Sequence, residues 1–294
     1  MRRLYVLALA LLALALMTTP AGAGVKGHKV GQSKAAVKRY WTAERMRDAR
    51  PAERVRTNGG KVTQAKKGGG TTLSWQVMTD YTVFPTSTHG KVFFTEGTTN
   101  YVCSGTALLS ANESAVWTAG HCVHGGGNGA EFHTNWMFVP AYKDNNRPYG
   151  NFVASELYTT DGWLRSGDFE YDLGAAKVTP NTATLTDTVG GRGIAFDQAR
   201  QQTYRAYGYP AASPFNGQRL WYCEAAPTYT DGAGAQATMG IPCDMTGGSS
   251  GGGWVVGSKV LSVNSYHYKS LRNVMFGPYQ GSAAKGLYTT AASG

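Results

Sequence analysis

The sequence has little charge, and none of its apolar segments is long enough to cross a bilayer. Charged residues make up 16 % of the 294 residues, against 42 % hydrophobic and 12 % aromatic residues. This balance excludes a disordered chain, because enough apolar surface is available to build a core. The 39 glycines argue against a long helical protein. The apolar run at residues 4–17 is shorter than the ~20 residues that a membrane-spanning helix needs.

Residues 1–23 have the features of a secretory signal peptide. Arg2 and Arg3 precede the apolar run, and the small residues Ala21 and Ala23 follow it. A basic start, a short apolar middle and a small-x-small exit are typical of a cleaved signal. We therefore expect a secreted, extracellular protein with no membrane attachment after cleavage. The alternative is an uncleaved N-terminal anchor.

The excess of positive charge is confined to the first quarter of the chain. The formal net charge is +10, yet residues 71–294 carry 13 basic and 15 acidic residues, whereas residues 24–70 carry 13 basic and three acidic ones. A nucleic-acid-binding protein needs a basic face on its folded domain, so nucleic acid is not an expected partner. We interpret residues 24–70 as a propeptide with one short helix at residues 37–46. The alternative is a permanent basic tail that touches anionic cell-surface polymers.

Cysteines are few, and all of them lie beyond residue 70. They are Cys103, Cys122, Cys223 and Cys243. An even number of cysteines in an exported chain indicates two disulfides, for which three connectivities exist and sequential pairing is the simplest. A metal site made of Cys103, His121, Cys122 and His124 fits no standard zinc spacing. No metal and no cofactor is therefore expected.

The pattern of residues 71–294 predicts an all-β fold. Short runs rich in Val, Tyr, Phe, Trp and Thr alternate with clusters of Gly, Pro, Asn and Ser. The runs are residues 91–95, 115–118, 136–139, 173–178, 203–209, 253–256 and 260–268. This spacing is typical of antiparallel strands in a sandwich or barrel. Beyond residue 70, a helix is expected only at residues 197–202.

Three residues could carry chemistry. His121 follows a strand and stands beside Cys122, and a general base needs such a fixed position. Asp172 leads into an apolar strand that could carry it to a buried imidazole. Ser250 lies in the glycine-rich stretch 247–253, where backbone N–H groups can turn toward a developing oxyanion. Each has an ordinary structural explanation alone, but together they indicate nucleophilic catalysis.

Two motifs carry a resemblance to a known family. Thr118-Ala119-Gly120-His121-Cys122 resembles the histidine motif of chymotrypsin-like serine proteases, and Gly248-Ser249-Ser250-Gly251-Gly252 resembles their nucleophile motif. Asp172-Leu173-Gly174-Ala175 is similar to their aspartate strand, and Tyr101-Val102-Cys103-Ser104-Gly105-Thr106-Ala107 is similar to the strand whose cysteine pairs beside the histidine. The resemblance is nearest to secreted bacterial trypsin-like and glutamyl-endopeptidase-like enzymes and covers about residues 80–285.

The resemblance implies a fold and a domain organisation. The family is built from two perpendicular, antiparallel, six-stranded β-barrels with the active site in the cleft between them. Here the protease domain would span residues 71–294, with barrels at about residues 75–185 and 190–290. The chain would then be a preproprotein, activated after removal of residues 24–70.

The resemblance also implies roles for single residues. Ser250 would attack the peptide carbonyl, His121 would take and return the proton, and Asp172 would orient His121. The N–H groups of Gly248 and Ser250 would form the oxyanion hole. Protein or peptide substrates are therefore the expected partners of an enzyme that is expected to be monomeric.

Further residues follow from the same resemblance. Ser265 matches the serine that supports the aspartate and begins the substrate-binding strand, which continues through Tyr266 and His267. Cys103 and Cys122 match the disulfide near the histidine, and a Cys223–Cys243 pair would follow. The other histidines of this region, His89, His124 and His133, are assigned to solvated positions.

Two departures from the family affect activation and specificity. Ser249 stands where the trypsin branch has the aspartate that receives the freed N-terminus, so we predict activation without that ion pair, through unblocking or folding assistance. Asp244 lies six positions before Ser250, where an acid selects Lys or Arg by a charge-assisted hydrogen bond. A glutamate-selective pocket would instead need a histidine near Asn264, and His267 lies three residues on. Asp244 favours basic residues, and the glutamate preference stays open.

Two rival functions remain. Asp168, Glu170 and Asp172 alternate and would share one face of a strand, as paired carboxylates of a glycoside hydrolase, or they could hold structural calcium. That hypothesis leaves His121 and Ser250 unexplained. The second rival is a protease-like module that has lost activity and only binds a partner. Since all three catalytic residue types are present, nothing in the sequence favours it.

Overall fold

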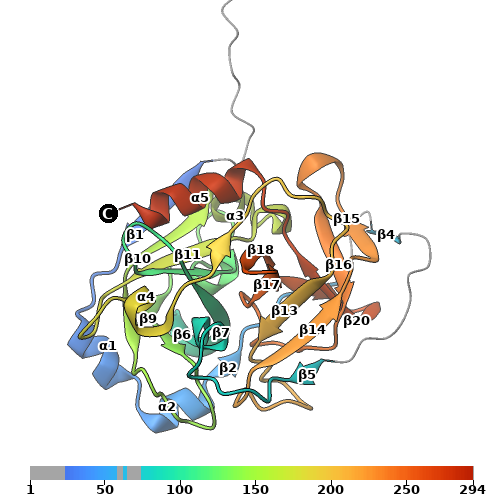
Figure 1. Cartoon of the computed structure of the whole chain (residues 1–294). Helices are drawn as coiled ribbons and strands as arrows, with labels where there is room; N and C mark the ends of the chain where they lie inside the picture. The colour runs from blue at the N-terminus through green and yellow to red at the C-terminus, as the bar shows by residue number, and fades with distance from the viewer. Residues whose placement is uncertain (1–23, 58–61, 65–73, 294) are drawn as a thin grey trace, which may run out of the picture.

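The computed structural model describes residues 24–57, 62–64 and 74–293, which form two β-rich units side by side (Figure 1). The predicted signal peptide, residues 1–23, lies outside the described residues. Among the described residues, no helix combines the length and the apolar character that crossing a bilayer requires.

The first unit is a closed, six-stranded antiparallel barrel. Its strands are β6 (His89–Glu96), β7 (Thr99–Leu108), β8 (Ala115–Thr118), β9 (Thr134–Pro140), β10 (Phe152–Thr160) and β11 (Gly174–Val178). The ladder runs β10-β11-β8-β7-β6-β9, and β9 closes it by pairing with β10 as well. Large apolar side chains fill the interior, among them Trp117, Phe138 and Phe152.

The second unit consists of two sheets. Its strands are β12 (Gly193–Ile194), β13 (Tyr204–Gly208), β14 (Trp221–Ala225), β15 (Tyr229–Asp231), β16 (Thr238–Pro242), β17 (Gly253–Val256), β18 (Lys259–Val263), β19 (Tyr266–Tyr268) and β20 (Leu271–Gly277). One sheet has the order β12-β18-β17-β13-β14-β5, with β5 at Trp75–Gln76. The other has the order β3-β19-β20-β16-β15-β4, with β3 at Val55–Arg56 and β4 at Val62–Gln64. The all-β, two-barrel fold class is thus confirmed, with the second unit less regularly closed than the first.

Six of the seven predicted strand runs each coincide with one observed strand. The seventh, residues 260–268, contains two strands, β18 and β19, which are separated at Asn264 and Ser265. This break moves the chain from one sheet of the second unit to the other, and it carries Ser265 toward the first unit.

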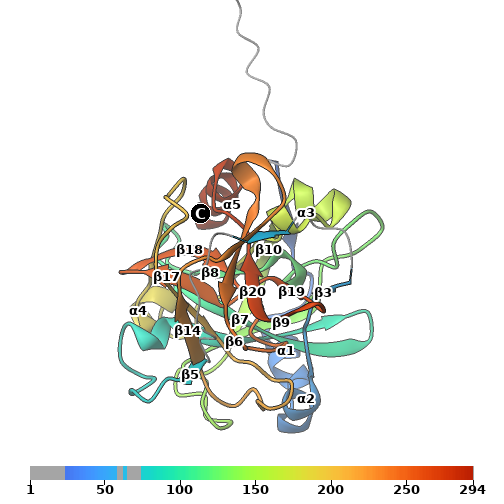
Figure 2. The same ribbon diagram turned by 90° about the vertical axis from the view of Figure 1, so that its right-hand side faces the viewer.

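We call residues 24–70 the leader. Its described residues pair with strands of both units, which a solvated tail would not do. Strand β1 (Val25–Lys29) is antiparallel to β10, and β4 (Val62–Gln64) is antiparallel to β15. Between them, β2 (Arg50–Pro51) lies parallel to β7 of the first unit (Figure 1), and β3 (Val55–Arg56) lies parallel to β19 of the second (Figure 2). We call residues 50–56 the crossing segment, because they pass from one unit to the other.

The helices differ from the sequence prediction. The expected helix at residues 37–46 is two helices, α1 (Lys34–Tyr40) and α2 (Ala43–Asp48), because Thr42 caps α2 through its side chain. The helix predicted at residues 197–202 is wrong: Asp197 has φ +55°, a left-handed conformation that a helix does not accept.

Further helical segments lie around the two units. They are α3 (Asp161–Ser166), α4 (Leu185–Val189), α5 (Ser282–Ala292) and the 3-10 turns η1 (Thr86–Thr88), η2 (Gly120–Cys122), η3 (Phe169–Tyr171) and η4 (Gly234–Gln236). Helix α5 packs along the first unit (Figure 1). The sequence did not reveal it because its buried face consists mostly of alanines, such as Ala283 and Ala284, which give a weak apolar pattern.

Candidate active site

The position of His121 is fixed by the neighbouring disulfide and by Asp172. It lies in η2, directly after β8, and Cys122 is bonded to Cys103 on β7. The imidazole is 1 % exposed, and its Nδ1 lies 2.8 Å from Oδ2 of Asp172. The other carboxylate oxygen accepts the backbone N–H of His121 at 2.7 Å. One carboxylate therefore fixes both the ring and the main chain of the histidine.

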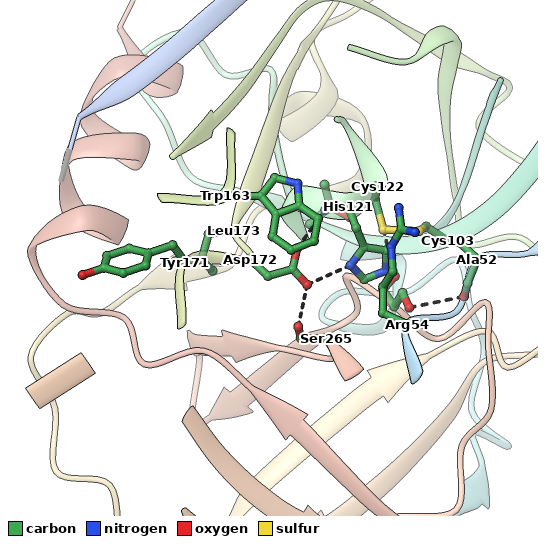
Figure 3. Close-up of polar contacts among 12 residues, drawn as sticks. Ala52, Arg54, Cys103, His121, Cys122, Trp163, Tyr171, Asp172, Leu173 and Ser265 are labelled. Atoms are coloured by element: carbon green, nitrogen blue, oxygen red, sulfur yellow. Dashed lines mark hydrogen bonds and ion pairs between the residues drawn. A yellow bond between two sulfur atoms is a disulfide. The ribbon is translucent and has the colours of Figure 1, made fainter. Parts of the chain in front are cut away.

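Asp172 is fully buried between His121 and Ser265 (Figure 3). The Ser265 hydroxyl donates a hydrogen bond to Oδ2 at 2.5 Å. Burial alone would raise the pKa of Asp172, but the charge of His121 and the hydrogen bonds from His121 and Ser265 outweigh it and lower the pKa below its ordinary value. The carboxylate therefore stays ionised at neutral pH and can stabilise a positive imidazole.

Ser250 lies in the turn between β16 and β17. Gly248 and Gly251 on either side have φ values of +92° and +80°, which side-chain-bearing residues rarely adopt. A Cβ atom on Gly251 would stand 2.0 Å from Oγ1 of Thr118 on β8. The glycines thus let the turn approach the first unit, where the Ser250 carbonyl accepts the N–H of Ser104 at 2.7 Å.

The hydroxyl of Ser250 is engaged by the crossing segment. Its Oγ donates to the carbonyl oxygen of Ala52 at 3.4 Å, and the same oxygen accepts the N–H of Gly248 at 2.8 Å. Within the described residues, Nε2 of His121 has no hydrogen-bond partner. In Figure 3, Ala52 lies on the side of the imidazole away from Asp172. The structure thus joins His121 to Asp172, whereas the hydroxyl of Ser250 contacts the backbone carbonyl of Ala52.

The predicted substrate-binding residues also contact the crossing segment. The backbone N–H of His267 donates to the Arg54 carbonyl at 3.2 Å, in the parallel pairing of β3 with β19. Its ring Nε2 lies 3.7 Å from Oε1 of Glu53. The strand expected to hold a substrate is therefore covered by residues 53–56 of the same chain.

Asp244 lies on a cavity of about 270 Å³ next to the crossing segment. Its Oδ1 accepts the backbone N–H of Ser74 at 2.7 Å. The same cavity is lined by Lys269, Arg272 and His267 and by the acidic Glu53. Asp244 thus already accepts a main-chain hydrogen bond and shares its cavity with side chains of both charge signs, so this geometry does not favour basic substrate residues over acidic ones.

The structure corrects the assignment of three histidines to solvated positions. His89, His124 and His133 are all buried. His133 makes a hydrogen bond from Nε2 to the carbonyl of His121 at 3.1 Å, and burial lowers its pKa to about 3. It is therefore neutral at physiological pH and supports the main chain of His121. Isolated histidines between loop residues give no sequence signal for such a role.

Two other sites considered from the sequence, a metal site at Cys103, His121 and Cys122 and a row of carboxylates on one strand, do not fit the structure. Cys103, His121 and Cys122 gather within 4.8 Å, but the two sulfurs are bonded to each other and Nδ1 of His121 faces Asp172. Such a donor set does not suit a metal ion. Asp168 and Glu170 do not share a strand face with Asp172, because this stretch forms the 3-10 turn η3, which Asp168 caps. The spatial basis of the glycoside hydrolase hypothesis is thus absent.

The second predicted pair of cysteines is likewise bonded. Cys223 on β14 joins Cys243, which directly follows β16, across the core of the second unit. The structure thus has sequential pairing, with no free cysteine among the described residues.

Comparison with solved structures gives matches over most of this chain. A thermostable serine protease, AL20, from an extremophilic microorganism is 47 % identical, with a TM-score of 0.66, and the match covers 70 % of this chain and 97 % of that one. Protease Anisep from Arthrobacter nicotinovorans is 44 % identical, with a TM-score of 0.65 and coverage of 71 % and 96 %. A Glu endopeptidase shares the fold at 19 % identity and a TM-score of 0.61, covering 79 % of this chain and 100 % of that one.

Sequence comparisons add less. No family model matches the chain. An extracellular metalloprotease of Bacillus subtilis (strain 168) is 30 % identical over 92 residues, which are 31 % of this chain and 28 % of that protein. The chain therefore spans little more than a quarter of this curated relative.

Proposed function

The chain belongs to the chymotrypsin-like serine proteases, and from this premise we propose that it is a secreted endopeptidase whose catalytic residues are Ser250, His121 and Asp172. The observation that carries the proposal is the buried Asp172, which contacts Nδ1 of His121 on one side and the Ser265 hydroxyl on the other. This arrangement leaves Nε2 of His121 directed away from the carboxylate and available to accept a proton.

The proposed mechanism uses these groups in two steps. Ser250 Oγ attacks the scissile carbonyl carbon while Nε2 of His121 removes its proton, and Asp172 stabilises the imidazolium. The N–H groups of Gly248 and Ser250 hold the oxyanion, and loss of one such donor costs ~10²–10³ in rate. His121 then gives the proton to the leaving amine, and water hydrolyses the acyl-enzyme by the same route. The position of the Ala52 carbonyl oxygen on Gly248 N–H supports this site for the oxyanion.

We further propose that the protein is made as a latent precursor, with a propeptide at residues 24–70. The crossing segment supports this, because the Ala52 carbonyl takes the hydrogen bond that the Ser250 hydroxyl would otherwise give to His121. While its proton is directed to the carbonyl oxygen of Ala52, the Ser250 hydroxyl is not hydrogen-bonded to the base that would activate it. Activation would then consist of removing residues 50–56 from the cleft.

A fluorophosphonate probe tests the proposed nucleophile. We expect a single covalent adduct on the processed protein, located at Ser250 by mass spectrometry of its peptides. Ser250→Ala should abolish the adduct, and Ser249→Ala should retain it, because the Ser249 hydroxyl is occupied by the Thr246 carbonyl at 2.8 Å. An adduct that depends on Ser249 would show that the wrong serine was chosen, and no adduct at either position would refute the protease proposal.

Proline substitutions in the leader test the latency. Ala52→Pro removes the N–H that donates to the Val102 carbonyl at 2.9 Å, so the crossing segment should leave the cleft more often. In the full chain, before processing, we expect the rate of Ser250 labelling to rise by about tenfold. Ala43→Pro is the matched control, since Ala43 is exposed at the first position of α2, where proline is tolerated. Equal labelling rates in the two variants and the unsubstituted chain would contradict the proposal that the crossing segment keeps Ser250 inactive.

A further inference from the structure

A second feature of the cleft is a cage that holds the side chain of Arg56. Nη1 of Arg56 lies 3.0 Å from Oδ2 of Asp231. The guanidinium carbon stands 5.2 Å from the centre of the Phe169 ring and 5.4 Å from the centres of both the Tyr266 and Tyr268 rings. We call Asp231, Phe169, Tyr266 and Tyr268 the guanidinium cage. A carboxylate combined with three aromatic faces is a favourable environment for a planar cation.

The cage is built by the two units and not by the leader. Asp231 is 3 % exposed, and its Oδ2 accepts the hydroxyls of Tyr266 at 2.6 Å and Tyr268 at 2.7 Å. The Tyr266 hydroxyl also shares a 2.7 Å hydrogen bond with Thr238. These contacts connect β15, β16 and β19, and they hold the carboxylate and the two tyrosine rings without the help of Arg56.

The position of the cage makes it part of the substrate cleft. Tyr266 directly follows Ser265, which contacts Asp172, and β19 is the strand expected to hold a substrate. Arg56 lies four residues beyond Ala52, whose carbonyl stands at Ser250. At ~3.3 Å per extended residue, this separation corresponds to at most about 13 Å. An extended peptide with its scissile bond at Ser250 can therefore reach the cage with a side chain a few residues away.

The negative charge of Asp231 favours the binding of another cation in the cage after Arg56 has left. Among the ion pairs of the described residues, Arg56 is the cationic partner of Asp231. A buried carboxylate that loses its cation is unfavourable, and a new cation restores the pair. Neither the triad nor the oxyanion hole uses Asp231. The contacts of Arg56 therefore indicate which ligand the cage accepts, namely a guanidinium group.

We propose that the guanidinium cage is a specificity subsite of the processed protease, which selects substrates with an arginine a few residues from the scissile bond. The proposal rests on the proposed function, because it assumes that Ser250 cleaves a peptide lying along β19. In the full chain Arg56 occupies the subsite and anchors the crossing segment. After removal of the leader, a substrate arginine takes its place. Arginine is favoured over lysine because its planar group stacks on the rings while it bonds to the carboxylate.

Peptide substrates with one arginine test the subsite. In a series of peptides, the arginine is moved through the positions within five residues of the cut, and each peptide is compared with its citrulline counterpart, which has the same shape without the charge. At one position, we expect kcat/KM for the arginine peptide to exceed that for the citrulline peptide by about tenfold. In Asp231→Asn the ratio of kcat/KM for the arginine peptide to that for the citrulline peptide should fall to within about twofold.

The outcomes separate the subsite from the proposed function. A ratio that is the same in the unsubstituted enzyme and in Asp231→Asn, or a ratio near one at every position, overturns the subsite while Ser250-dependent cleavage still supports the protease. If no peptide is cleaved in a Ser250-dependent manner, the proposed function fails and the subsite fails with it.

A second measurement on the full chain does not require a folded Asp231 variant. Arg56→Gln removes the cation from the cage, so the crossing segment should loosen and Ser250 should be labelled several-fold faster by the fluorophosphonate. Arg47→Gln is the matched control, because the side chain of Arg47 is 63 % exposed and pairs only with its neighbour Asp48 among the described residues. If Arg56→Gln behaves like Arg47→Gln, the cage does not hold its cation effectively, and the proposal is overturned.

Discussion

His121→Ala is expected to lower kcat of the processed protease by about 10⁶-fold. The reason is that Nε2 of His121 is the base for Ser250 in the proposed mechanism, and without it the hydroxyl keeps its proton at neutral pH. His133 cannot replace it, because Nε2 of His133 faces the backbone carbonyl of His121 and burial lowers the pKa of His133 to about 3. Single-turnover measurements with a chromogenic peptide would give the loss in the chemical step directly.

The neighbouring histidine supplies the control for this prediction. His124 lies two residues after Cys122, and its Nδ1 accepts the N–H of Gly126 at 3.0 Å. His124→Ala should therefore reduce kcat by less than about tenfold, through a local change in the loop. If His121→Ala kept more than about a hundredth of the activity, or if both variants lost the same amount, His121 could not be the general base.

Asp172→Asn is expected to lower kcat by about 10⁴-fold while leaving the fold intact. The asparagine amide occupies the same volume, but its NH₂ group would face Nδ1 of His121 or the Ser265 hydroxyl in place of an acceptor. The imidazole would then favour the tautomer with its proton on Nε2, which cannot accept the proton of Ser250. KM should change little, because Asp172 is fully buried and does not line the cleft.

The matched control for Asp172→Asn is the same change four residues earlier. Asp168 caps η3 by accepting the N–H of Glu170 at 3.0 Å, and asparagine caps such turns equally well. Asp168→Asn should therefore leave kcat within about twofold. Equal losses in the two variants would instead support a reaction that uses this group of carboxylates, as the glycoside hydrolase hypothesis requires.

The parts of the fold and site that could be predicted from the sequence have strong local signals. The strands alternate with turn residues, and His121 and Ser250 lie in short motifs whose glycines and cysteine have direct structural reasons. Asp172 could be placed because it precedes an apolar strand. For His121, Asp172 and Ser250, the local sequence pattern was enough to indicate the position in the fold, because each residue lies close to the end of a strand, beside the cleft.

The contact of the crossing segment with Ser250 could not be predicted from the sequence because it is made by a backbone atom. The carbonyl of Ala52 is held by Gly248 and Ser250, and a carbonyl at an alanine has no side-chain signature. The basic composition of residues 24–70 suggested a solvated segment. Yet Arg56, one of these basic residues, is held by the buried Asp231, which lies 175 residues away in the sequence.

The most direct test of the central claim is a crystal structure of the processed protein without the proposed propeptide, residues 24–70. We expect the Ser250 hydroxyl to turn from the place of the Ala52 carbonyl to Nε2 of His121, with an Oγ to Nε2 distance of about 2.6–3.2 Å. The Nδ1 contact of His121 with Asp172 should persist at about its present 2.8 Å. A processed protein that hydrolyses peptides while this oxygen and this nitrogen stay out of contact, with and without a bound inhibitor, would contradict the account.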